Sequence, residues 1–503
     1  MNHASSNTTG GTPDLQGNAL SAKDLLIAGM SYMAPGFSFF FTTALVAASA
    51  GIFMPISYVL AGLGVLCTGY VFAEFSKFAP SAGALQVFVD RGFGRIASIG
   101  AGLVLLAGYL CLQTGVLALF GGWTSHLIDR AFGFEIPWPL LSVIGMVAVT
   151  ALMVRGVQMS VRATWVLFLS EFVLVVLVAV VVLMRGGDSG LSAAPFHLTD
   201  LGDVGWSGIA LGMVFCVFSF VGFEGAISFA EETPNPAKAM PIAVLGGVAV
   251  IAVLYVVGTY AAVVGFGIDN IDALAGDAEP ISTLADRYSP ILEPLLAVAV
   301  LTSIVANLTA AGNANARVLF NMGREGAVPA VLGRVESRYR TPAIAIVTFM
   351  LGTLILALAA ATRWDYATSF GYIAGLGALL ALLIYMLATV ALPFYVIRSG
   401  QPLRPVPHVF VPVLGAGIWL VPMWGTLKPG QSWPASIYPG IAIGLVVVVG
   451  LYAVARSRRT PGDGAVGITA FAAEALRRRR LPRLPRCRHN TQRVTLGESQ
   501  GER

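Results

Sequence analysis

The chain has 503 residues, of which 56% are hydrophobic and 11% are charged. Soluble domains carry roughly 25% charged residues, so this composition excludes a soluble globular protein and predicts an all-α polytopic membrane protein. The net charge of +5 does not indicate a nucleic-acid partner, because much of the positive excess lies in the C-terminal tail. The four cysteines contain no CxxC spacing, which favours neither a metal site nor a disulfide framework, and we expect no cofactor.

Residues 1–23 are polar and rich in Ser, Thr, Asn and Gly, which predicts a disordered N-terminal tail rather than a signal peptide. Beyond the tail, each apolar stretch of about 20 residues predicts one transmembrane helix. We expect 12 transmembrane helices, at about 25–50, 54–74, 96–120, 138–155, 162–184, 206–230, 241–266, 290–312, 342–361, 368–395, 409–427 and 436–455. The last two lie in residues 409–456, and residues 457–503 form a basic tail.

The basic residues orient these spans, because cytoplasmic loops carry an excess of Lys and Arg. One set of loops holds most of the basic residues outside the tail, from Lys23 to Arg404. The opposite set holds Arg130, Arg185, Arg287, Arg363 and Lys428. The sequence therefore predicts a cell-membrane protein with both termini cytoplasmic. The arginine-rich C-terminal tail is then expected to be attracted to anionic lipid of the inner leaflet.

The sixth span carries an unusual interruption, Val221-Gly222-Phe223-Glu224-Gly225. A glycine costs roughly 1 kcal/mol relative to alanine in a helix interior, and a carboxylate at bilayer depth costs roughly 2.5–3.5 kcal/mol. A span that carries both is predicted to be broken, with its freed backbone groups facing a cavity rather than lipid. That is the expected form of a substrate site in a secondary transporter.

The first span has its own interruption, Met33-Ala34-Pro35-Gly36-Phe37. Proline removes a helix donor and clashes with the preceding turn. The two interruptions lie five spans apart, which divides the chain into residues 24–185 and residues 205–396, two halves of opposite orientation. Matching interruptions indicate the site of an inverted-repeat transporter. The alternative is a pair of ordinary proline and glycine kinks.

Four stretches resemble the amino acid–polyamine–organocation superfamily of permeases. They are FSFVGFEGAISFAEETPNPAKAMPIAV around span six, FAEFSKFAPSAGALQVFVDRGFG after span two, AGYLCLQTGVLALFG in span three and NANARVLFNMGREGAVPAVLGRVESRYRTPAIAI after span eight. The resemblance covers the chain from about Leu25 to Tyr395. The resemblance implies a LeuT-like 5+5 inverted repeat plus two C-terminal helices, and import of amino acids or related amines by alternating access.

The resemblance also implies where the substrate binds. In the family, the amino and carboxylate groups of the substrate lie against the unwound backbone of spans one and six. In this chain those positions are Ala34, Pro35, Gly36 and Phe37, together with Phe220, Val221, Gly222, Phe223 and Glu224. Many members have Gly-x-Gly in span one, where this chain has Ala-Pro-Gly. The chemistry agrees, because a helix N-terminus binds a carboxylate and unwound carbonyl groups accept from an amine.

Further residues have two interpretations each. The polar side chains of Tyr109, Gln113, Asn307 and Tyr372 either complete the pocket or form hydrogen bonds between helices. Phe218, Phe220 and Phe223 either close the site as an aromatic gate or face lipid. Glu231 and Glu232 near Lys238 are predicted to form a solvated cytoplasmic patch.

Two carboxyl groups are candidates for coupling transport to protons. Related proton-driven members place a lysine in span five, but this chain has Glu171 near that position and no lysine in the span. A carboxyl group among Leu, Phe and Val side chains can take up and release a proton as the cavity wets and dries. Glu224 matches the family glutamate more closely, so we expect it to carry the coupling and Glu171 to titrate second or to bond a neighbouring helix.

The predicted function is therefore proton-coupled import of amino acids, with sodium the less favoured ion and the lipid bilayer as the surroundings. A transporter of polyamines or other organic amines on the same fold is the alternative, and it would need several acidic side chains in the pocket. A membrane sensor without transport activity is a further alternative. An enzyme is not expected, because the spans contain no cluster of His and Asp.

Overall fold

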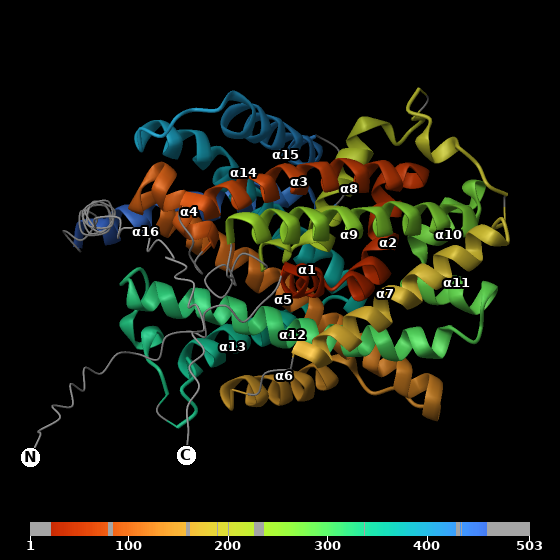
Figure 1. The fold of residues 1–503 in the computed structure, drawn as a ribbon. Helices are drawn as coiled ribbons and strands as arrows, with labels where there is room; N and C mark the ends of the chain where they lie inside the picture. The colour runs from red at the N-terminus through yellow and green to blue at the C-terminus, as the bar shows by residue number, and fades with distance from the viewer. Residues whose placement is uncertain are drawn as a thin grey trace, which may run out of the picture. The chain divides into compact units, whose positions relative to one another are not determined.

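A computed structural model describes residues 22–78, 84–156, 161–188, 190–199, 201–225, 236–336, 338–428, 433 and 435–459. Every regular element in these ranges is helical (Figure 1). The α-helices are α1 Ala22–Met33, α2 Pro35–Ala50, α3 Met54–Phe78, α4 Ala84–Phe93, α5 Arg95–Phe132, α6 Trp138–Val154, α7 Val161–Met184, α8 Gly205–Phe220, α9 Pro236–Phe266, α10 Ile271–Gly276, α11 Pro280–Tyr288, α12 Glu293–Arg324, α13 Ala343–Ala361, α14 Tyr366–Arg398, α15 Val411–Leu427 and α16 Tyr438–Arg459. Short 3-10 turns lie at Gly51–Phe53, Ala194–Phe196, Ile268–Asn270, Ala330–Gly333 and Ala435–Ile437, and Val406–Phe410 forms a π-turn before α15.

Ten helical segments in the described residues are long and apolar enough to cross a membrane, so the chain is a polytopic membrane protein. One of the ten, Leu25–Lys77, contains the three helices α1, α2 and α3. The apolar helix Trp138–Val154 is shorter than the others and is not among the ten. The expected number of twelve spans and their pairing as inverted halves stay predictions.

The chain folds back so that segments far apart in sequence pack together. Helix α3 packs against α8 and α9, and α1 packs against α9 and touches α12. Figure 1 shows α1 between α9 and α12, with α3 and α9 running side by side. The two compact units of the chain divide after Ser457, and all the contacts described below lie in the first.

Helices α5 and α14 form the most extensive helix pair, and small residues allow their close approach. A Cβ atom on Gly377 of α14 would lie 2.8 Å from the carbonyl oxygen of Gly108 on α5. Small residues at membrane helix interfaces let backbones approach and gain packing contacts. A larger side chain at either glycine would force these two helices apart.

Helices α5 and α12 both continue well past the expected ends of their spans. The third span was expected to end near residue 120, yet α5 continues through Gly121 and Gly122 to Phe132. These glycines are packing positions: a Cβ atom on Gly122 would lie 2.0 Å from the ring of Tyr366 in α14. Helix α12 likewise runs to Arg324, past the expected end near residue 312. Gly312 lies within this continuous helix and packs against Met153 and Met350.

Several predictions concern residues outside the described part of the chain. These are the N-terminal tail up to residue 21, the carboxylate patch at Glu231 and Glu232, and the basic C-terminal tail beyond residue 459; the last two residues of the predicted N-terminal tail, Ala22 and Lys23, are already helical in α1. The return of span six to a helix after Gly225 also lies outside it, because residues 226–235 are not described.

Candidate functional site

The first span is interrupted at Ala34, between α1 and α2. Ala34 has the left-handed conformation, with φ 42° and ψ 62°. The residue before a proline is driven out of the right-handed helical region, and Pro35 itself fits the first position of a new helix. The hydroxyl group of Ser38 donates to the Met33 carbonyl at 3.1 Å, which supplies a partner that a continuous helix would have given. The interruption predicted from Pro35 and Gly36 is therefore present.

Helix α8, at the sixth span, ends at Phe220, and a turn at Val221 and Gly222 and a 3-10 turn over residues 223–225 follow; residues 221–225 are called the span-six interruption here. Val221 leaves the helix with ψ 133°, and Gly222 has φ 106°, a conformation that strongly favours glycine. The two interruptions touch: a Cβ atom on Gly222 would lie 2.6 Å from the carbonyl oxygen of Tyr32 at the end of α1. Gly225 meets the Tyr32 ring in the same way, at 2.8 Å. Glycine is needed here for both the backbone angle and the close approach.

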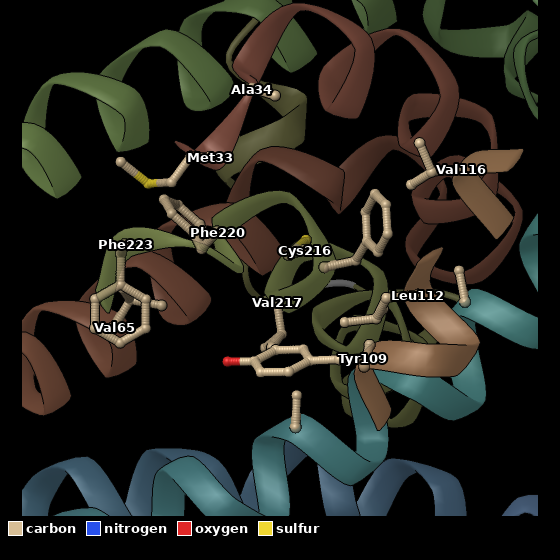
Figure 2. Packing of buried hydrophobic residues seen from close by; sticks show 14 of the residues in the cluster. Met33, Ala34, Val65, Tyr109, Leu112, Val116, Cys216, Val217, Phe220 and Phe223 are labelled. Carbon is tan, nitrogen blue, oxygen red and sulfur yellow. The ribbon is translucent and has the colours of Figure 1, made fainter. Parts of the chain in front are cut away.

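Figure 2 shows this meeting point from close by, with Met33 and Ala34 on one side of Phe220 and with Phe223 and Tyr109 around it. Met33, Ala34, Phe220 and Phe223 are all buried. The centre of the helical bundle therefore combines irregular backbone from two spans with an apolar surround. Irregular backbone at membrane depth is tolerated where protein or a water-filled cavity surrounds it.

Glu224 is held by hydroxyl groups from two other helices. The hydroxyl group of Tyr109 on α5 donates to Glu224 Oε1 at 2.5 Å, and that of Tyr385 on α14 donates to the same oxygen at 3.0 Å. The second oxygen, Oε2, accepts from the Gly222 N–H group at 3.1 Å. The carboxyl group thus ties the span-six interruption to the α5–α14 pair, and no cationic side chain takes part in these three contacts.

Glu171 of α7 lies against the other interruption and is 4% exposed. Its carboxyl group interacts with the backbone N–H of Gly36, in the first turn of α2, and with the hydroxyl group of Ser303 on α12. A Cβ atom on Gly36 would lie 2.8 Å from Glu171 Oε2. The N-terminus of a helix carries partial positive charge, so Glu171 occupies the anion-binding end of α2.

The three phenylalanines of span six are buried, so the lipid-facing interpretation was wrong. Phe218 packs edge-on against Phe37 of α2 and Phe370 of α14, with ring centroids 6.3 Å and 5.1 Å away. Phe220 and Phe223 pack elsewhere, Phe220 against Tyr255 and Tyr58, and Phe223 against Phe72 and Tyr385. Phe218 therefore belongs to an aromatic cluster with Phe37 and Phe370, and the other two do not.

The four polar residues considered as additional pocket residues lie in different parts of the helical bundle. Tyr109 lies at the centre, as a partner of Glu224. Gln113 donates to the Leu308 carbonyl at 2.9 Å and so forms a hydrogen bond between helices α5 and α12. Tyr372 packs its ring against Trp364 and Trp433, away from the contacts of Glu224. Asn307 is half-buried on α12, one turn beyond the Ser303 that reaches Glu171.

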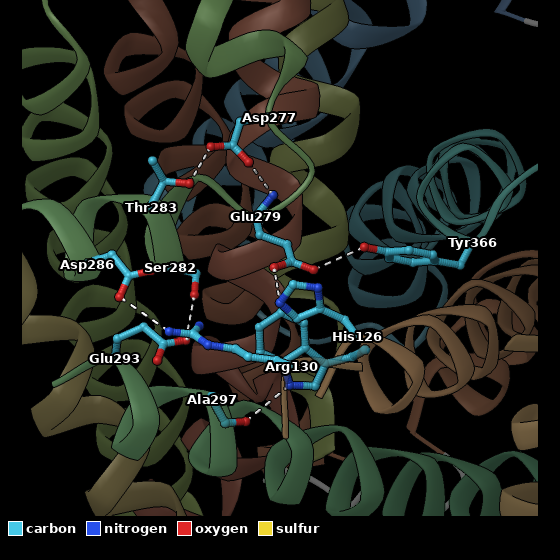
Figure 3. A network of polar contacts seen from close by, with 11 residues as sticks. His126, Arg130, Asp277, Glu279, Ser282, Thr283, Asp286, Glu293, Ala297 and Tyr366 are labelled. Carbon is cyan, nitrogen blue, oxygen red and sulfur yellow. Dashed lines mark hydrogen bonds and ion pairs between the residues drawn. The ribbon is translucent and has the colours of Figure 1, made fainter. Parts of the chain in front are cut away.

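A second polar group of residues surrounds α11 (Figure 3) and is called the α11 network here. Glu279 lies 3.3 Å from His126 Nε2 and accepts from the Tyr366 hydroxyl at 3.0 Å. Glu293 forms an ion pair with Arg130 and accepts from the Ser282 hydroxyl at 3.1 Å. Burial raises the pKa of the Glu279 carboxyl above its usual value, while the neighbouring His126 and the Tyr366 hydroxyl act to lower it.

A chain of packed rings connects the α11 network to the aromatic cluster of Phe37, Phe218 and Phe370. The ring of His126 stacks on Trp123 of α5, at 5.5 Å. Trp123 packs edge-on against Phe41 of α2, whose ring lies 6.4 Å from Phe370. The α11 network is therefore connected, ring by ring, to the aromatic cluster around Phe218.

The fold and the central geometry define a class of protein. The break between α1 and α2 meets the non-helical end of α8 at a buried polar centre, and secondary transporters use such breaks to expose backbone groups to a substrate. Residues 20–450 match the family described as amino acid permease. The chain therefore belongs to the amino acid permease family, which confirms the resemblance carried by the four motifs and makes the chain a membrane transporter, not an enzyme.

Relatives of known name extend over most of the chain. The methylthioribose transporter of Bacillus subtilis (strain 168) is 26% identical over 451 residues, which are 85% of this chain and 92% of the relative. The branched-chain amino acid permease BcaP of the same organism is 25% identical over 449 residues, 85% of this chain and 91% of the relative. Cationic amino acid transporter 7, chloroplastic, of Arabidopsis thaliana is 25% identical over 326 residues, 61% of this chain and 55% of the relative.

Proposed function

We propose that the protein imports amino acids across the cell membrane by proton-coupled secondary transport, with the substrate bound between the interruptions at Ala34 and Gly222. The contact between Gly222 and Tyr32 carries this proposal, because it brings the irregular backbone of both spans to one point. The proposed substrate-binding positions are those predicted from the sequence: Ala34, Pro35, Gly36, Phe37, Phe220, Val221, Gly222, Phe223 and Glu224. Tyr109 and Tyr385 are added as the residues that hold Glu224.

The architecture that we infer is the LeuT-like one of five plus five inverted helices and two more. Counting α1 with α2 as one interrupted span, α3 as the second and α6 as the fourth brings the ten long apolar segments to twelve. The interrupted spans are then the first and the sixth. The excess of basic residues in one set of loops supports the orientation with both termini in the cytoplasm.

Coupling to protons follows from a competition at the N-terminus of α2. A zwitterionic substrate presents a carboxylate, and the positive end of a half-helix is the place that favours it. Glu171 already interacts there with the Gly36 N–H group. Two carboxylates at one helix end repel each other, so a proton taken up by Glu171 would let the substrate carboxylate approach. Glu224, bonded to both tyrosines, is the principal coupling residue in this proposal and Glu171 the second.

The charged side chains beside the interruptions and the names of the relatives together indicate the substrate class. Carboxyl groups lie beside both interruptions, and none of the contacts described above for Glu171 and Glu224 involves a cationic side chain. The relatives are named for branched-chain amino acids, cationic amino acids and methylthioribose. A competition panel should therefore include all three classes, together with polyamines, which would need more acidic groups than these two.

The deciding measurement is radiolabelled uptake into proteoliposomes with an imposed pH gradient, with and without sodium. We expect accumulation of an amino acid that depends on the gradient and not on sodium. Glu224→Gln should abolish gradient-driven accumulation, whereas Glu135→Gln, an exposed carboxyl change, should not. Transport that needs sodium and ignores the gradient would refute proton coupling, and intact accumulation by Glu224→Gln would remove Glu224 from that role. A protein that binds but never transports would be a sensor.

The proposed orientation has its own test. Cysteines introduced near Asp188 and Asp272 should react with an impermeant thiol reagent added to intact cells. A cysteine near Arg338 should react only after the membrane is opened. Labelling near Arg338 from outside would reverse the topology.

A further inference from the structure

A groove of about 430 Å³ runs between α6 and α13, away from the central interruptions. It is lined by Met146, Val147, Thr150, Ala151, Val154, Arg155, Tyr339, Val347, Met350, Leu351 and Leu354. Val147 is 62% exposed and Leu351 is 51% exposed, although both lie in apolar helices. Exposed apolar side chains on membrane helices face lipid, so the groove opens to the bilayer rather than to the transport site.

The groove is apolar along its length and cationic at one end. Thr150, the polar residue in its middle, turns its hydroxyl group to Met146 Sδ at 3.6 Å. Arg155 is the charged residue among the lining residues, and it follows the last residue of α6. Tyr339 lines the same end, and the guanidinium group of Arg338 lies 5.1 Å from its ring centroid. Two arginines are thus grouped where the apolar wall stops.

The cationic end of the groove is held in a fixed shape. The hydroxyl group of Thr341 donates to the Val154 carbonyl at 2.8 Å, which joins the end of α6 to the segment before α13. The acidic residue nearby, Glu336, accepts from the Tyr339 N–H group at 2.7 Å. This hydrogen bond orients the Glu336 side chain toward the Tyr339 backbone, and Arg155 and Arg338 are both exposed.

We propose that this groove binds an anionic phospholipid, with an acyl chain between α6 and α13 and the phosphate at Arg155 and Arg338. Basic pockets between membrane helices at the cytoplasmic surface bind anionic lipid head groups. The match is one of charge and of polarity along the groove: an apolar tail faces the apolar wall and an anionic head faces the arginines. In the orientation proposed above, the head group lies in the cytoplasmic leaflet.

The proposal is tested with the purified full-length protein in two kinds of nanodisc, one of phosphatidylcholine alone and one with phosphatidylglycerol added. Native mass spectrometry of protein released from the discs counts the retained lipids. We expect one phosphatidylglycerol to be retained in preference to phosphatidylcholine. Arg155→Gln and Arg338→Gln should each weaken that preference about fivefold, since one near-surface charge contributes about 1 kcal/mol. Arg404→Gln, an exposed arginine on the same side of the membrane, should leave it unchanged.

A groove-filling variant separates the site from general attraction of charge. Ala151→Phe keeps both arginines but fills the apolar part of the groove, so it should lose the retained lipid. Uptake activity per folded protein is measured in parallel. Equal retention of phosphatidylglycerol by wild type, Arg155→Gln and Ala151→Phe would overturn the proposal. Displacement of the lipid by glycerol 3-phosphate, which has no acyl chain, would also overturn it and identify a soluble phosphate site. Uptake that fails while lipid retention persists would refute the transport proposal alone.

Discussion

The replacement of Gly222 by alanine tests the contact between the two interruptions directly. Gly222 has φ 106°, and a residue with a side chain held in such a conformation costs roughly 1–3 kcal/mol. The added Cβ atom would also lie 2.6 Å from the Tyr32 carbonyl oxygen and 2.8 Å from its carbon. Both are backbone atoms that cannot rotate away, and such overpacking costs a further 1–3 kcal/mol or so. We expect Gly222→Ala to lose about 2–6 kcal/mol of stability, or to separate α1 from α8.

The matched control is Gly186→Ala, in the turn after α7. Gly186 has φ 79°, and a Cβ atom there would meet nothing within 4 Å. It therefore carries the conformational cost without the steric one, and the difference between the two variants isolates the approach to Tyr32.

Both variants should be purified in the same detergent, and their thermal unfolding and their binding of the best transported amino acid measured. Gly222→Ala should unfold at a lower temperature than Gly186→Ala and should bind the substrate more weakly than wild type. If the two variants unfold together and bind as wild type does, the interruptions are not in contact and the reasoning fails.

Three further changes are expected to have distinct outcomes. A Cβ atom at position 36 would lie 2.8 Å from Glu171 Oε2, so Gly36→Leu should lose substrate binding without loss of expression. Unchanged substrate affinity in this variant would place the binding site elsewhere. Tyr385→Phe removes a hydrogen bond to a carboxylate, worth roughly 1.5–3 kcal/mol, so uptake should fall at least about tenfold, whereas Tyr372→Phe should behave as wild type. The raised pKa of Glu279 means that the folded protein binds the carboxyl proton more tightly than the unfolded chain does. The protonated Glu279 therefore adds stability below the ordinary carboxyl pKa, and this contribution is lost as the pH rises through the raised pKa of the folded protein. The unfolding temperature of wild type should therefore fall as the pH rises through this range, and that of Glu279→Gln should lack this fall. An identical pH profile of the unfolding temperature in both proteins would contradict the assignment.

The interruptions were predictable because proline and glycine leave a clear trace in an apolar sequence. Pro35 excludes a continuous helix by its missing N–H group, and the paired glycines around Glu224 have few other uses in a span. The left-handed conformation of Ala34 was not predictable, because an alanine gives no sign of it. It follows from Pro35 and from the packing around it rather than from Ala34 itself.

The partners of the two carboxyl groups could not be read from the sequence. Tyr372 and Tyr385 lie on the same helix, α14, and the sequence around neither marks it as a partner of Glu224. Only the packing of α14 against α5 decides that Tyr385 reaches Glu224. The same holds on α12, where Ser303 rather than Asn307 meets Glu171. Sequence patterns indicate which helices surround the site, whereas the rotation of each helix about its axis depends on contacts along its full length.

The pairing of α5 with α14 has a practical consequence for measuring motion. Each helix contributes to both polar groups: α5 through Tyr109 and His126, and α14 through Tyr385 and Tyr366. At 1.5 Å per residue, the two contact points on each helix are about 26–28 Å apart, close to the thickness of the hydrocarbon core. Spin or fluorescent labels placed on these two unbroken helices would form an internal ruler. Distances from that ruler to α1 and α8 would report which half of each interrupted span moves during a transport cycle.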